Sequence, residues 1–235
     1  MVKKKLLIIG GSSGIGSYLI QKLNSEYNIF ATYNKNSFRH GNIKTFKLNL
    51  TMESNLIHNE LSKLNIIPDA LIYLPGGGLN FKKYEYGISS WQKILDINVL
   101  KFIDIMNFYL PLFKKKKYAR ILCFSSSAIS DNSSNIPYAC SKAYLEQYIK
   151  KTGNFFASSN ILLNCIRTSI IAFNKNNWAK AMIQNKSKVD KIVKQKLSVN
   201  KIGVPEDLFP IINHLISSKN KFSTGSTFNI DGGFK

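Results

Sequence analysis

The chain has 235 residues, 44% of them hydrophobic, and a formal net charge of +20. This length and composition suit one globular domain over residues 1–235 and exclude a disordered chain. No apolar run approaches the about 20 residues of a membrane-spanning helix. The apolar run of residues 6–9 is also too short for the core of a signal peptide. We therefore expect a cytoplasmic protein that has no membrane partner.

Lysine carries nearly all of the positive charge. Thirty of the 33 basic residues are lysines, and the arginines are Arg39, Arg120 and Arg167. Side chains that read bases and phosphates are usually arginines, and the chain has no helix-turn-helix, RNA-binding or zinc signature. We expect no nucleic-acid partner. A composition rich in lysine, asparagine and isoleucine is typical of A/T-biased coding, and an anionic ligand is the second interpretation.

The cysteines and histidines show no spacing typical of a metal site. The cysteines are odd in number, which indicates buried reduced thiols rather than a set of disulfides. The histidines are scattered and form no ligand set. We expect no metal at these six residues: Cys123, Cys140, Cys165, His40, His58 and His214.

Short apolar runs alternate with longer segments of helical periodicity. We predict strands at residues 5–10, 27–33, 43–50, 69–74, 118–126, 161–169 and 225–233, and helices at 13–26, 54–65, 91–115, 138–157 and 205–218. Strand–helix alternation with nearly continuous apolar strands predicts a doubly wound parallel sheet with helices on both faces. Residues 173–201 are polar and lysine-rich, and form either a lid over a site or a solvated pair of helices.

The segment GGSSGIG follows the first predicted strand and opens the first predicted helix. Its glycines, Gly10, Gly14 and Gly16, have the spacing G-x-x-x-G-x-G. Glycines allow a tight turn and close backbone approach, and the N–H groups of a helix N-terminus bind a pyrophosphate. A helix-capping loop is the alternative. The position directly after a strand favours a dinucleotide-binding turn.

The end of the second predicted strand indicates which dinucleotide binds. An acidic side chain there accepts hydrogen bonds from the adenosine ribose, whereas a basic one favours a 2′-phosphate. The segment ATYNKNSFRH has no Asp or Glu, and it contains Lys35 and Arg39. Asn34 and Ser37 can hydrogen-bond to either dinucleotide. We expect NADP rather than NAD, against the alternative that lysine is simply frequent in this chain.

Tyr138 and Lys142 lie at i and i+4 near the start of a predicted helix, so they share one face. A free phenol has a pKa near 10, so proton exchange near pH 7 needs about 4 kcal/mol of phenolate stabilisation. An ammonium about 5 Å away supplies about 3 kcal/mol at an effective dielectric constant of 20. This pair therefore indicates an acid–base group that acts on a carbonyl or an alcohol.

Three serines, Ser125, Ser126 and Ser127, stand at the end of the fifth predicted strand. The carboxyl ends of parallel strands line the ligand crevice of such a sheet. A serine hydroxyl there can donate a hydrogen bond to a substrate carbonyl. For any one serine the alternative is a solvated loop.

Together these motifs resemble the short-chain dehydrogenase/reductase family, and the chain is similar to its 3-oxoacyl-carrier-protein reductases. The resemblance runs from about residue 5 to the C-terminus. It rests on GGSSGIG, DINV, the strand-end serines, YACSK and VPEDL…TGSTFNIDGG. It implies a Rossmann-like α/β domain with seven parallel strands, assembled as a homotetramer or dimer. The implied reaction is hydride transfer between a nicotinamide cofactor and a carbonyl, free or linked to an acyl carrier.

The resemblance also implies roles for individual residues. Tyr138 falls on the catalytic acid–base, Lys142 on its activating lysine and Asn98 on the asparagine of a proton relay. Ser126 falls on the substrate-orienting serine, with Ser125 or Ser127 as alternatives. The implied cofactor-binding residues are Gly10, Ser12, Ser13, Gly14, Ile15, Gly16, Asn34, Lys35, Asn49, Leu50, Gly76, Tyr138, Lys142 and Ile171.

Several positions depart from the family pattern. The N-N-A-G after the fourth strand is here YLPG, and Pro75 removes a backbone donor. The usual P-G after the sixth strand is Thr168-Ser169, preceded by Arg167. Phe173 replaces a phosphate-bonding threonine, and Ile9 a threonine before the first glycine. Arg167 is expected either to meet an anionic substrate or to pair with a surface acid.

Three functions are compatible with these features. An active NADPH-dependent carbonyl reductase is favoured, because all four catalytic positions hold the required residue types. A binding or regulatory protein that kept the fold and lost turnover is the alternative, and the altered YLPG and RTS segments support it. A nucleic-acid-binding protein ranks third, since charge alone supports it.

Overall fold

The computed structural model describes residues 2–12, 14–41, 43–79, 87–173 and 176–235. Its strands form one all-parallel sheet of seven in the order β3-β2-β1-β4-β5-β6-β7. They are β1 (Lys4–Ile9), β2 (Tyr27–Tyr33), β3 (Lys44–Lys47), β4 (Ala70–Tyr73), β5 (Ala119–Ser126), β6 (Ile161–Thr168) and β7 (Ser226–Ile230). The predicted doubly wound α/β fold with seven parallel strands is confirmed.

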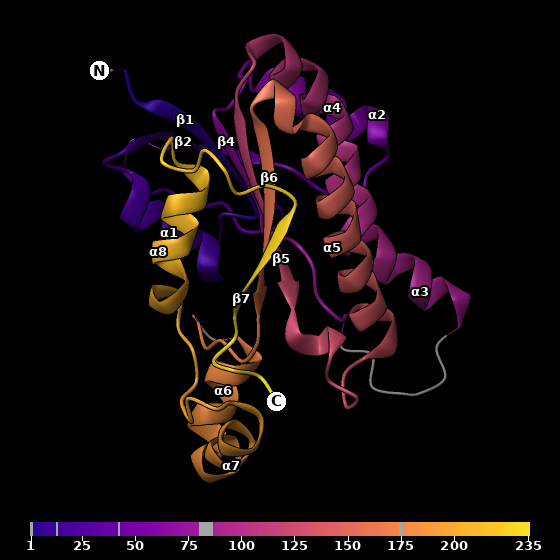
Figure 1. Cartoon of the computed structure of the whole chain (residues 1–235), viewed down its shortest axis with the longest axis vertical. Coiled ribbons are helices and arrows are strands. Elements are labelled where there is room, and N and C mark those ends of the chain that lie inside the picture. The colour runs from indigo at the N-terminus through magenta and orange to yellow at the C-terminus, as the bar shows by residue number, and fades with distance from the viewer. Residues whose placement is uncertain (1, 13, 42, 80–86, 174–175) are drawn as a thin grey trace.

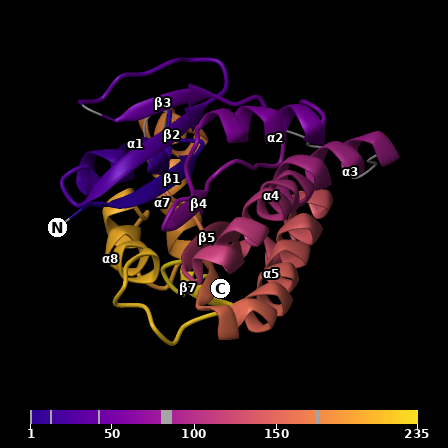
Figure 2. The ribbon, with the colours of Figure 1, turned by 90° about the horizontal axis from the view of Figure 1, so that it is seen from above.

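Helices cover both faces of the sheet (Figures 1 and 2). One face carries α2 (Ser54–Lys63), α4 (Lys101–Lys116) and α5 (Ile136–Phe156), and the other carries α1 (Gly14–Leu23) and α8 (Pro205–Ile216). The strand order reverses between β1 and β4. Ligands bind at the carboxyl ends of the strands at such a reversal, so the fold places a binding crevice there.

Two apolar clusters hold the helices to the sheet. Alternate residues of a strand point to opposite faces, so Leu7 and Ile9 of β1 join the cluster under α4 and α5, whereas Leu6 and Ile8 join the cluster under α1 and α8. These four side chains are at most 1% exposed. This two-sided burial explains why the strands read as continuous apolar runs. In the described part of the chain, no helix combines the length and apolarity that crossing a membrane requires.

The long helix predicted at residues 91–115 is one helical segment with an irregular centre. It consists of α3 (Ile88–Leu95), a π-helical segment (Asp96–Leu100) and α4. Single π turns within helices often mark functional sites. Here the π turn spans the DINVL sequence and carries the fully buried Asn98.

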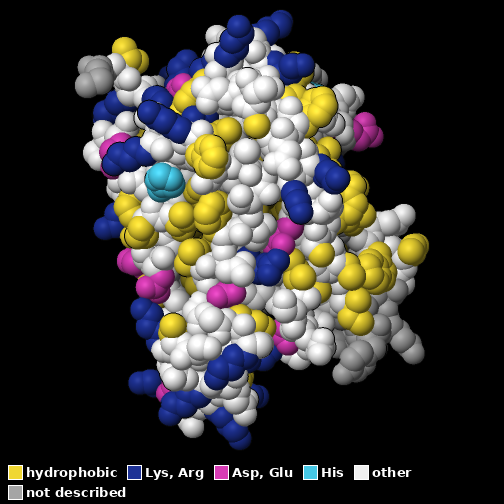
Figure 3. All heavy atoms as spheres, viewed as in Figure 1, with side chains coloured by type: hydrophobic (Ala, Val, Ile, Leu, Met, Phe, Trp, Pro, Cys, Tyr) yellow, Lys and Arg dark blue, Asp and Glu magenta, His cyan; other side chains and the backbone are white. Residues whose placement is uncertain are grey.

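The polar segment at residues 173–201 contains two helices, α6 (Asn177–Gln184) and α7 (Lys186–Lys196). They project beyond the sheet as a small lobe (Figure 1), on which Lys and Arg side chains gather (Figure 3). A separate apolar cluster of Ile170, Val189, Val193 and Leu197 anchors the lobe. The expectation of a helix pair is therefore confirmed, and the lobe begins next to the glycine turn.

Helix α5 approaches the start of β7 at Gly153. A Cβ atom at this position would lie 2.6 Å from the backbone N of Gly225 and 2.8 Å from its Cα. Both neighbours are backbone atoms that cannot move away without shifting the strand. The absence of a side chain at residue 153 therefore sets how closely α5 packs on the sheet.

Replacing Gly153 by Ala should destabilise the protein by about 1–3 kcal/mol, because the methyl group overpacks the α5–β7 contact. In an open helix position the same change would stabilise by about 1 kcal/mol. Urea unfolding of Gly153→Ala measures the difference. A Gly153→Ala variant as stable as the parent would contradict the close packing.

Candidate active site

The glycine turn lies between β1 and α1, at the crevice where the strand order reverses. Gly10 has φ 86° and Gly14 has φ 58°, a region that favours glycine. At Gly16, a Cβ would lie 2.6 Å from the carbonyl oxygen of Gly10. The turn therefore needs its glycines, and it exposes the N-terminus of α1 toward the crevice as an anion-binding turn does.

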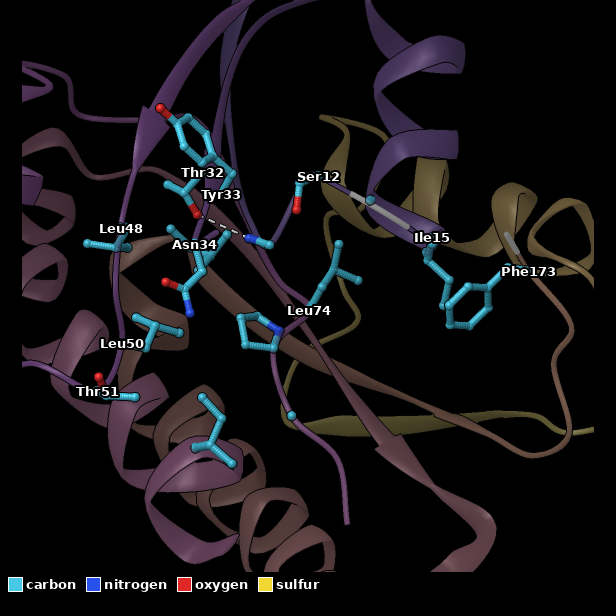
Figure 4. A pocket seen from close by; sticks show the side chains of 17 residues that line it. Ser12, Ile15, Thr32, Tyr33, Asn34, Leu48, Leu50, Thr51, Leu74 and Phe173 are labelled. Atoms are coloured by element: carbon cyan, nitrogen blue, oxygen red, sulfur yellow. Dashed lines mark hydrogen bonds between the residues drawn. The ribbon is translucent and has the colours of Figure 1, made fainter. Parts of the chain in front are cut away.

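Thr32 of β2 holds the backbone of the glycine turn through two hydrogen bonds. Its Oγ1 accepts a hydrogen bond from the N–H of Gly10 at 3.1 Å, and its carbonyl accepts one from the N–H of Gly11 at 2.8 Å. Thr32 is 2% exposed, and Figure 4 shows its hydroxyl directed at the turn. Sequence reasoning missed this residue. A polar side chain within an otherwise apolar buried strand was the available signal.

A cavity of about 370 Å³ opens beside the glycine turn (Figure 4). Eight predicted cofactor-binding residues line it: Gly10, Ser12, Gly14, Ile15, Gly16, Asn34, Leu50 and Gly76. Sequence reasoning missed Thr32, Tyr33, Leu48, Thr51, Leu74 and Ile97, which also line it. The cavity joins the ends of β1, β2 and β4. The structure thus brings together residues from three separate predicted motifs.

Other predicted cofactor residues lie outside this lining. Asn49 closes its own turn, where its Oδ1 accepts from the N–H of Thr51 at 3.0 Å. Ile171 is 6% exposed, pairs with Gly203 and lines a second cavity of about 280 Å³. Lys35 is not among the lining residues. Ser13 lies outside the described residues, so the roles of these four stay predictions.

Phe173 lies against the glycine turn from the opposite side. A Cβ at Gly14 would lie 2.5 Å from Cε2 of the Phe173 ring. The ring also lines the cavity beside Ile15 (Figure 4). An aromatic ring therefore stands where the family pattern has a threonine. Its contact with Gly14 was not visible in the sequence, because the chain returns to the turn only after β6.

Helix α5 begins where the catalytic residues are expected. The Asn135 side chain caps the helix by accepting from the N–H of Tyr138 at 2.9 Å, and Pro137 stands in the first turn. Tyr138 is half-buried, and Lys142 is 5% exposed. The Nζ of Lys142 donates to the carbonyl of Phe124 at 2.7 Å and lies 5.7 Å from the centroid of the Tyr138 ring. The predicted pair is thus brought together.

Asn98 joins this pair through the loop after β4. Its Nδ2 donates to the carbonyl of Gly77 at 3.0 Å, and its Oδ1 accepts from the N–H of Gly77 at 3.0 Å. A Cβ at Gly76 would lie 2.5 Å from Asn98 Oδ1 and 3.2 Å from Lys142 Nζ. Gly76 therefore lies between two predicted catalytic residues, and any side chain there would push them apart.

Tyr73, the first residue of YLPG, replaces an asparagine of the family pattern. Its hydroxyl donates to the carbonyl of Ile97 at 2.9 Å, within the π-helical segment. Burial raises the pKa of Tyr73 far above its ordinary value, so the phenol stays a neutral donor. The tyrosine thus anchors the neighbour of Asn98 to the end of β4. Sequence reasoning recorded the loss of the asparagine but missed this substitute.

The three strand-end serines differ in exposure. Ser126 is partly exposed, and its Oγ accepts from the N–H of Ala128 at 3.2 Å. Ser125 and Ser127 are 3% and 2% exposed. Within the described ranges, the Oγ of Ser125 has no hydrogen-bond partner. Exposure therefore favours Ser126 over its two alternatives as the serine that can meet a substrate.

Residues 57–235 match the family model described as enoyl-(acyl carrier protein) reductase, which covers more than half of the chain. The chain belongs to the short-chain dehydrogenase/reductase (SDR) family.

Curated relatives agree with this assignment. The chain is 28% identical over 239 residues to the 3-oxoacyl-[acyl-carrier-protein] reductase of Rickettsia prowazekii, covering 98% of this chain and 96% of the relative. It is 31% identical over 144 residues to dehydrogenase/reductase SDR family member 4 of Oryctolagus cuniculus, covering 61% of this chain. That match spans only about half of the rabbit protein, 54% of its length.

Solved structures share the SDR fold. A 3-oxoacyl (acyl-carrier-protein) reductase of Agrobacterium tumefaciens C58, solved with NADP bound, has a TM-score of 0.88 at 21% identity and covers 98% of this chain and 93% of that one. A 4-hydroxyisoleucine dehydrogenase complexed with NADH has a TM-score of 0.82 at 24% identity and covers 98% of both chains. At these identities the likeness concerns the fold alone.

Arg167, a departure from the SDR pattern, is already paired. Its Nε donates to Oε1 of Glu146 at 2.9 Å, and its Nη2 donates to Oε2 of the same carboxylate. Of its two expected roles, pairing with an acid is therefore the one observed. The acid is on α5, and its side chain is 14% exposed, so it is not a surface residue.

The structure also tests the expectations for the three cysteines and for a metal site. Cys123 and Cys165 are buried and unpaired, as expected, but Cys140 is exposed, so the expectation was wrong there. Cys140 falls on the outer side of the first turns of α5. In the residues that the structure describes, no three His, Cys, Asp or Glu side chains are grouped to hold a metal ion.

Replacing Thr32 by Val should destabilise this SDR by about 1 kcal/mol, because the N–H of Gly10 loses its acceptor in a partly buried turn without a change in shape. Thr32→Ser keeps the hydroxyl and should restore most of the loss. Urea unfolding measures both. Thr45→Val on edge strand β3 is the matched control. Equal stability of Thr32→Val and the parent would show that Thr32 does not hold the turn.

Proposed function

We propose that this SDR is an NADP-dependent reductase that converts a carbonyl into an alcohol, with Tyr138 as the proton donor. The observation that carries the proposal is the cluster of Tyr138, Lys142 and Asn98 beside a glycine-lined cavity. All three side chains belong to elements that meet at the carboxyl end of the sheet. The acid–base group and the nucleotide site therefore face the same crevice.

Lys142 prepares Tyr138 for proton transfer. Its ammonium lies 5.7 Å from the ring centroid of Tyr138 and is withdrawn from water. A positive charge beside a phenol favours the phenolate over the neutral form. Tyr138 donates its hydroxyl proton to the carbonyl oxygen of the substrate, and Ser126 donates a hydrogen bond to that same oxygen. Asn98 holds the Gly77 backbone that borders the cluster.

The lining of the cavity fits a nicotinamide dinucleotide. Gly10, Gly14 and Gly16 leave space that a Cβ would fill, and the N-terminus of α1 offers N–H groups to a pyrophosphate. Asn34 and Leu50 lie where an adenosine would be held. When bound, the reduced nicotinamide supplies the hydride for the substrate carbon.

One feature of the sequence supports NADP over NAD. The end of β2 has no acidic residue, while Lys35 and Arg39 follow it. Solved structures that share the fold do not separate the two cofactors, because three were solved with NADP or NADPH and three with NAD or NADH. A basic residue near the adenosine ribose suits a 2′-phosphate.

For the substrate, we propose a 3-oxoacyl group carried by an acyl carrier protein. The Rickettsia relative that spans nearly the whole chain carries this name. Carrier proteins are acidic, and the lysines of α7 form a basic surface on the lobe beside the crevice (Figure 3). We further propose that the protein acts in the cytoplasm as a homotetramer or a dimer, as the SDR resemblance implies.

One observation favours the alternative, a nucleotide-binding or regulatory SDR with weakened turnover. The Phe173 ring packs on Gly14, and Pro75 lies 3.3 Å from a Cβ built on Gly10. Both substitutions lie on the turn that would meet the pyrophosphate. Under this alternative the protein binds a dinucleotide, but a panel of ketones gives no turnover.

Tyr138→Phe should lower kcat for ketone reduction by about 10²–10⁴-fold, because the variant lacks the proton donor. NADPH binding, followed by fluorescence titration, should stay within about threefold of the parent. Tyr144→Phe, an exposed tyrosine on the same helix, is the matched control and should keep full activity. Unchanged turnover in Tyr138→Phe would contradict the proposed role.

Replacing both Lys35 and Arg39 by Ala should weaken NADPH binding by about tenfold and leave NADH binding nearly unchanged, because only NADPH carries the 2′-phosphate. Parallel fluorescence titrations with the two cofactors measure the ratio of dissociation constants. Lys44→Ala on β3 is the control for a general loss of positive charge. An equal loss for both cofactors would argue against selection by these residues.

A further inference from the structure

Glu146 lies one helical turn beyond Lys142 on α5. Residues at i and i+4 of a helix share a face, with Cβ atoms about 5–6 Å apart. A free carboxylate at residue 146 would therefore be within reach of the Lys142 ammonium. An ion pair between Glu146 and Lys142 would weaken the effect of the Lys142 ammonium on Tyr138, which lies one turn before Lys142.

Arg167 prevents this by binding both oxygens of the Glu146 carboxylate. Bidentate guanidinium–carboxylate pairs are among the strongest polar contacts in proteins. The two side chains are only 23% and 14% exposed, so water screens the pair weakly. In the part of the chain that the structure describes, Arg167 is the one hydrogen-bonding partner of this carboxylate. Lys142 itself forms no ion pair there.

The pair is held in place by the sheet. Arg167 is opposite Ser125 in the β5–β6 register, two residues beyond the Cys123–Cys165 pair. Side chains two apart in a strand share a face, and both cysteines belong to the cluster under α5. Figure 1 shows α5 running along these strands. Arg167 therefore joins the strand that ends at the crevice to the helix that carries Tyr138 and Lys142.

Three other ionisable side chains lie around the Arg167–Glu146 pair: Cys123, Cys165 and Asp231. Burial raises the pKa of Cys123 well above its ordinary value, so this β5 thiol is neutral, and Cys165 of β6 lies beside it. The hydrogen bonds that Arg167 donates to Glu146 raise the pKa of Arg167, and Asp231 after β7 acts in the same direction. Asp231 is engaged by its own turn, where it accepts from the N–H of Gly233 at 3.0 Å.

We propose that Arg167 is a positioning residue for the proposed reaction: by neutralising Glu146, it leaves the charge of Lys142 to act on Tyr138. The inference rests on the proposed function for its purpose, although the charge arrangement can be measured without a substrate. It gives a role to an arginine where the family pattern has a small residue.

The test is the ionisation of Tyr138, followed by tyrosinate ultraviolet absorbance as the pH is raised. The Tyr138 signal is the difference between each protein and the same protein carrying Tyr138→Phe. Arg167→Met should move the Tyr138 midpoint to higher pH by about one unit, because the uncompensated Glu146 offsets Lys142. The double variant Glu146→Gln/Arg167→Met should return the midpoint to within a few tenths of a unit of the parent.

Two controls separate charge from packing. Lys116→Met breaks the similarly buried Lys116–Asp69 ion pair at the far end of α4, and it should leave the midpoint unchanged. Glu146→Gln alone should lower the midpoint, because it leaves the charge of Arg167 uncompensated. If Arg167→Met does not fold, an unchanged midpoint in Glu146→Gln would contradict the proposal. A midpoint unchanged by Arg167→Met, or not recovered in the double variant, would overturn the proposal.

The pH profile of ketone reduction distinguishes failure of the positioning role of Arg167 from failure of the proposed reductase function. If the parent reduces ketones, the alkaline limb of its kcat profile should move with the Tyr138 midpoint in Arg167→Met and recover in the double variant. A midpoint that behaves as expected in a protein that reduces no ketone would support the charge arrangement and contradict the reductase. A reductase whose alkaline limb ignores Arg167→Met would contradict the positioning role.

Discussion

A buried positive charge on Lys142 is the constraint around which the crevice is arranged. The Lys142 side chain is only 5% exposed. Burying an ammonium costs free energy of folding unless its N–H groups meet hydrogen-bond acceptors. Its Nζ donates to the Phe124 carbonyl at the end of β5, and it lies beside the Gly76 backbone and the Asn98 amide. These contacts join α5, β5, the loop after β4 and the π-helical segment around one charge. The carboxylate of α5, Glu146, is bound by Arg167.

Local departures from the SDR pattern are compensated in this arrangement. The YLPG segment lacks the family's asparagines, but the Tyr73 hydroxyl anchors the π-helical segment through the Ile97 carbonyl. The segment thereby keeps Asn98 against Gly77. A glycine at residue 76 is required by the approach of both Asn98 and Lys142. The altered residues thus keep Asn98, Gly76 and Lys142 together, while Phe173 forms the wall of the cavity next to Gly14.

Periodicity and local chemistry predicted the fold and much of the crevice. The strands could be predicted because both of their faces are buried, which gives continuous apolar runs. The glycine turn, Tyr138 and Lys142 were recognisable because each depends on spacing within one element. Thr32, Tyr73 and Phe173 were missed because their roles depend on which distant backbone they meet. Arg167 was left between two roles for the same reason, since Glu146 lies 21 residues away and on another element. Lys35, Asn49 and Ile171 remain predictions, because they lie outside the lining of the cavity.

In the proposed function, the glycine-lined cavity and the Tyr138–Lys142 pair act on one substrate carbonyl. The most direct measurement is label transfer from NADPH deuterated at the reactive nicotinamide carbon to a panel of ketones that includes a 3-oxoacyl thioester. The account predicts deuterium on the carbinol carbon of at least one product. Tight NADPH binding with no label in any product would contradict it, and would leave a dinucleotide-binding protein that retains the acid–base pair without using it.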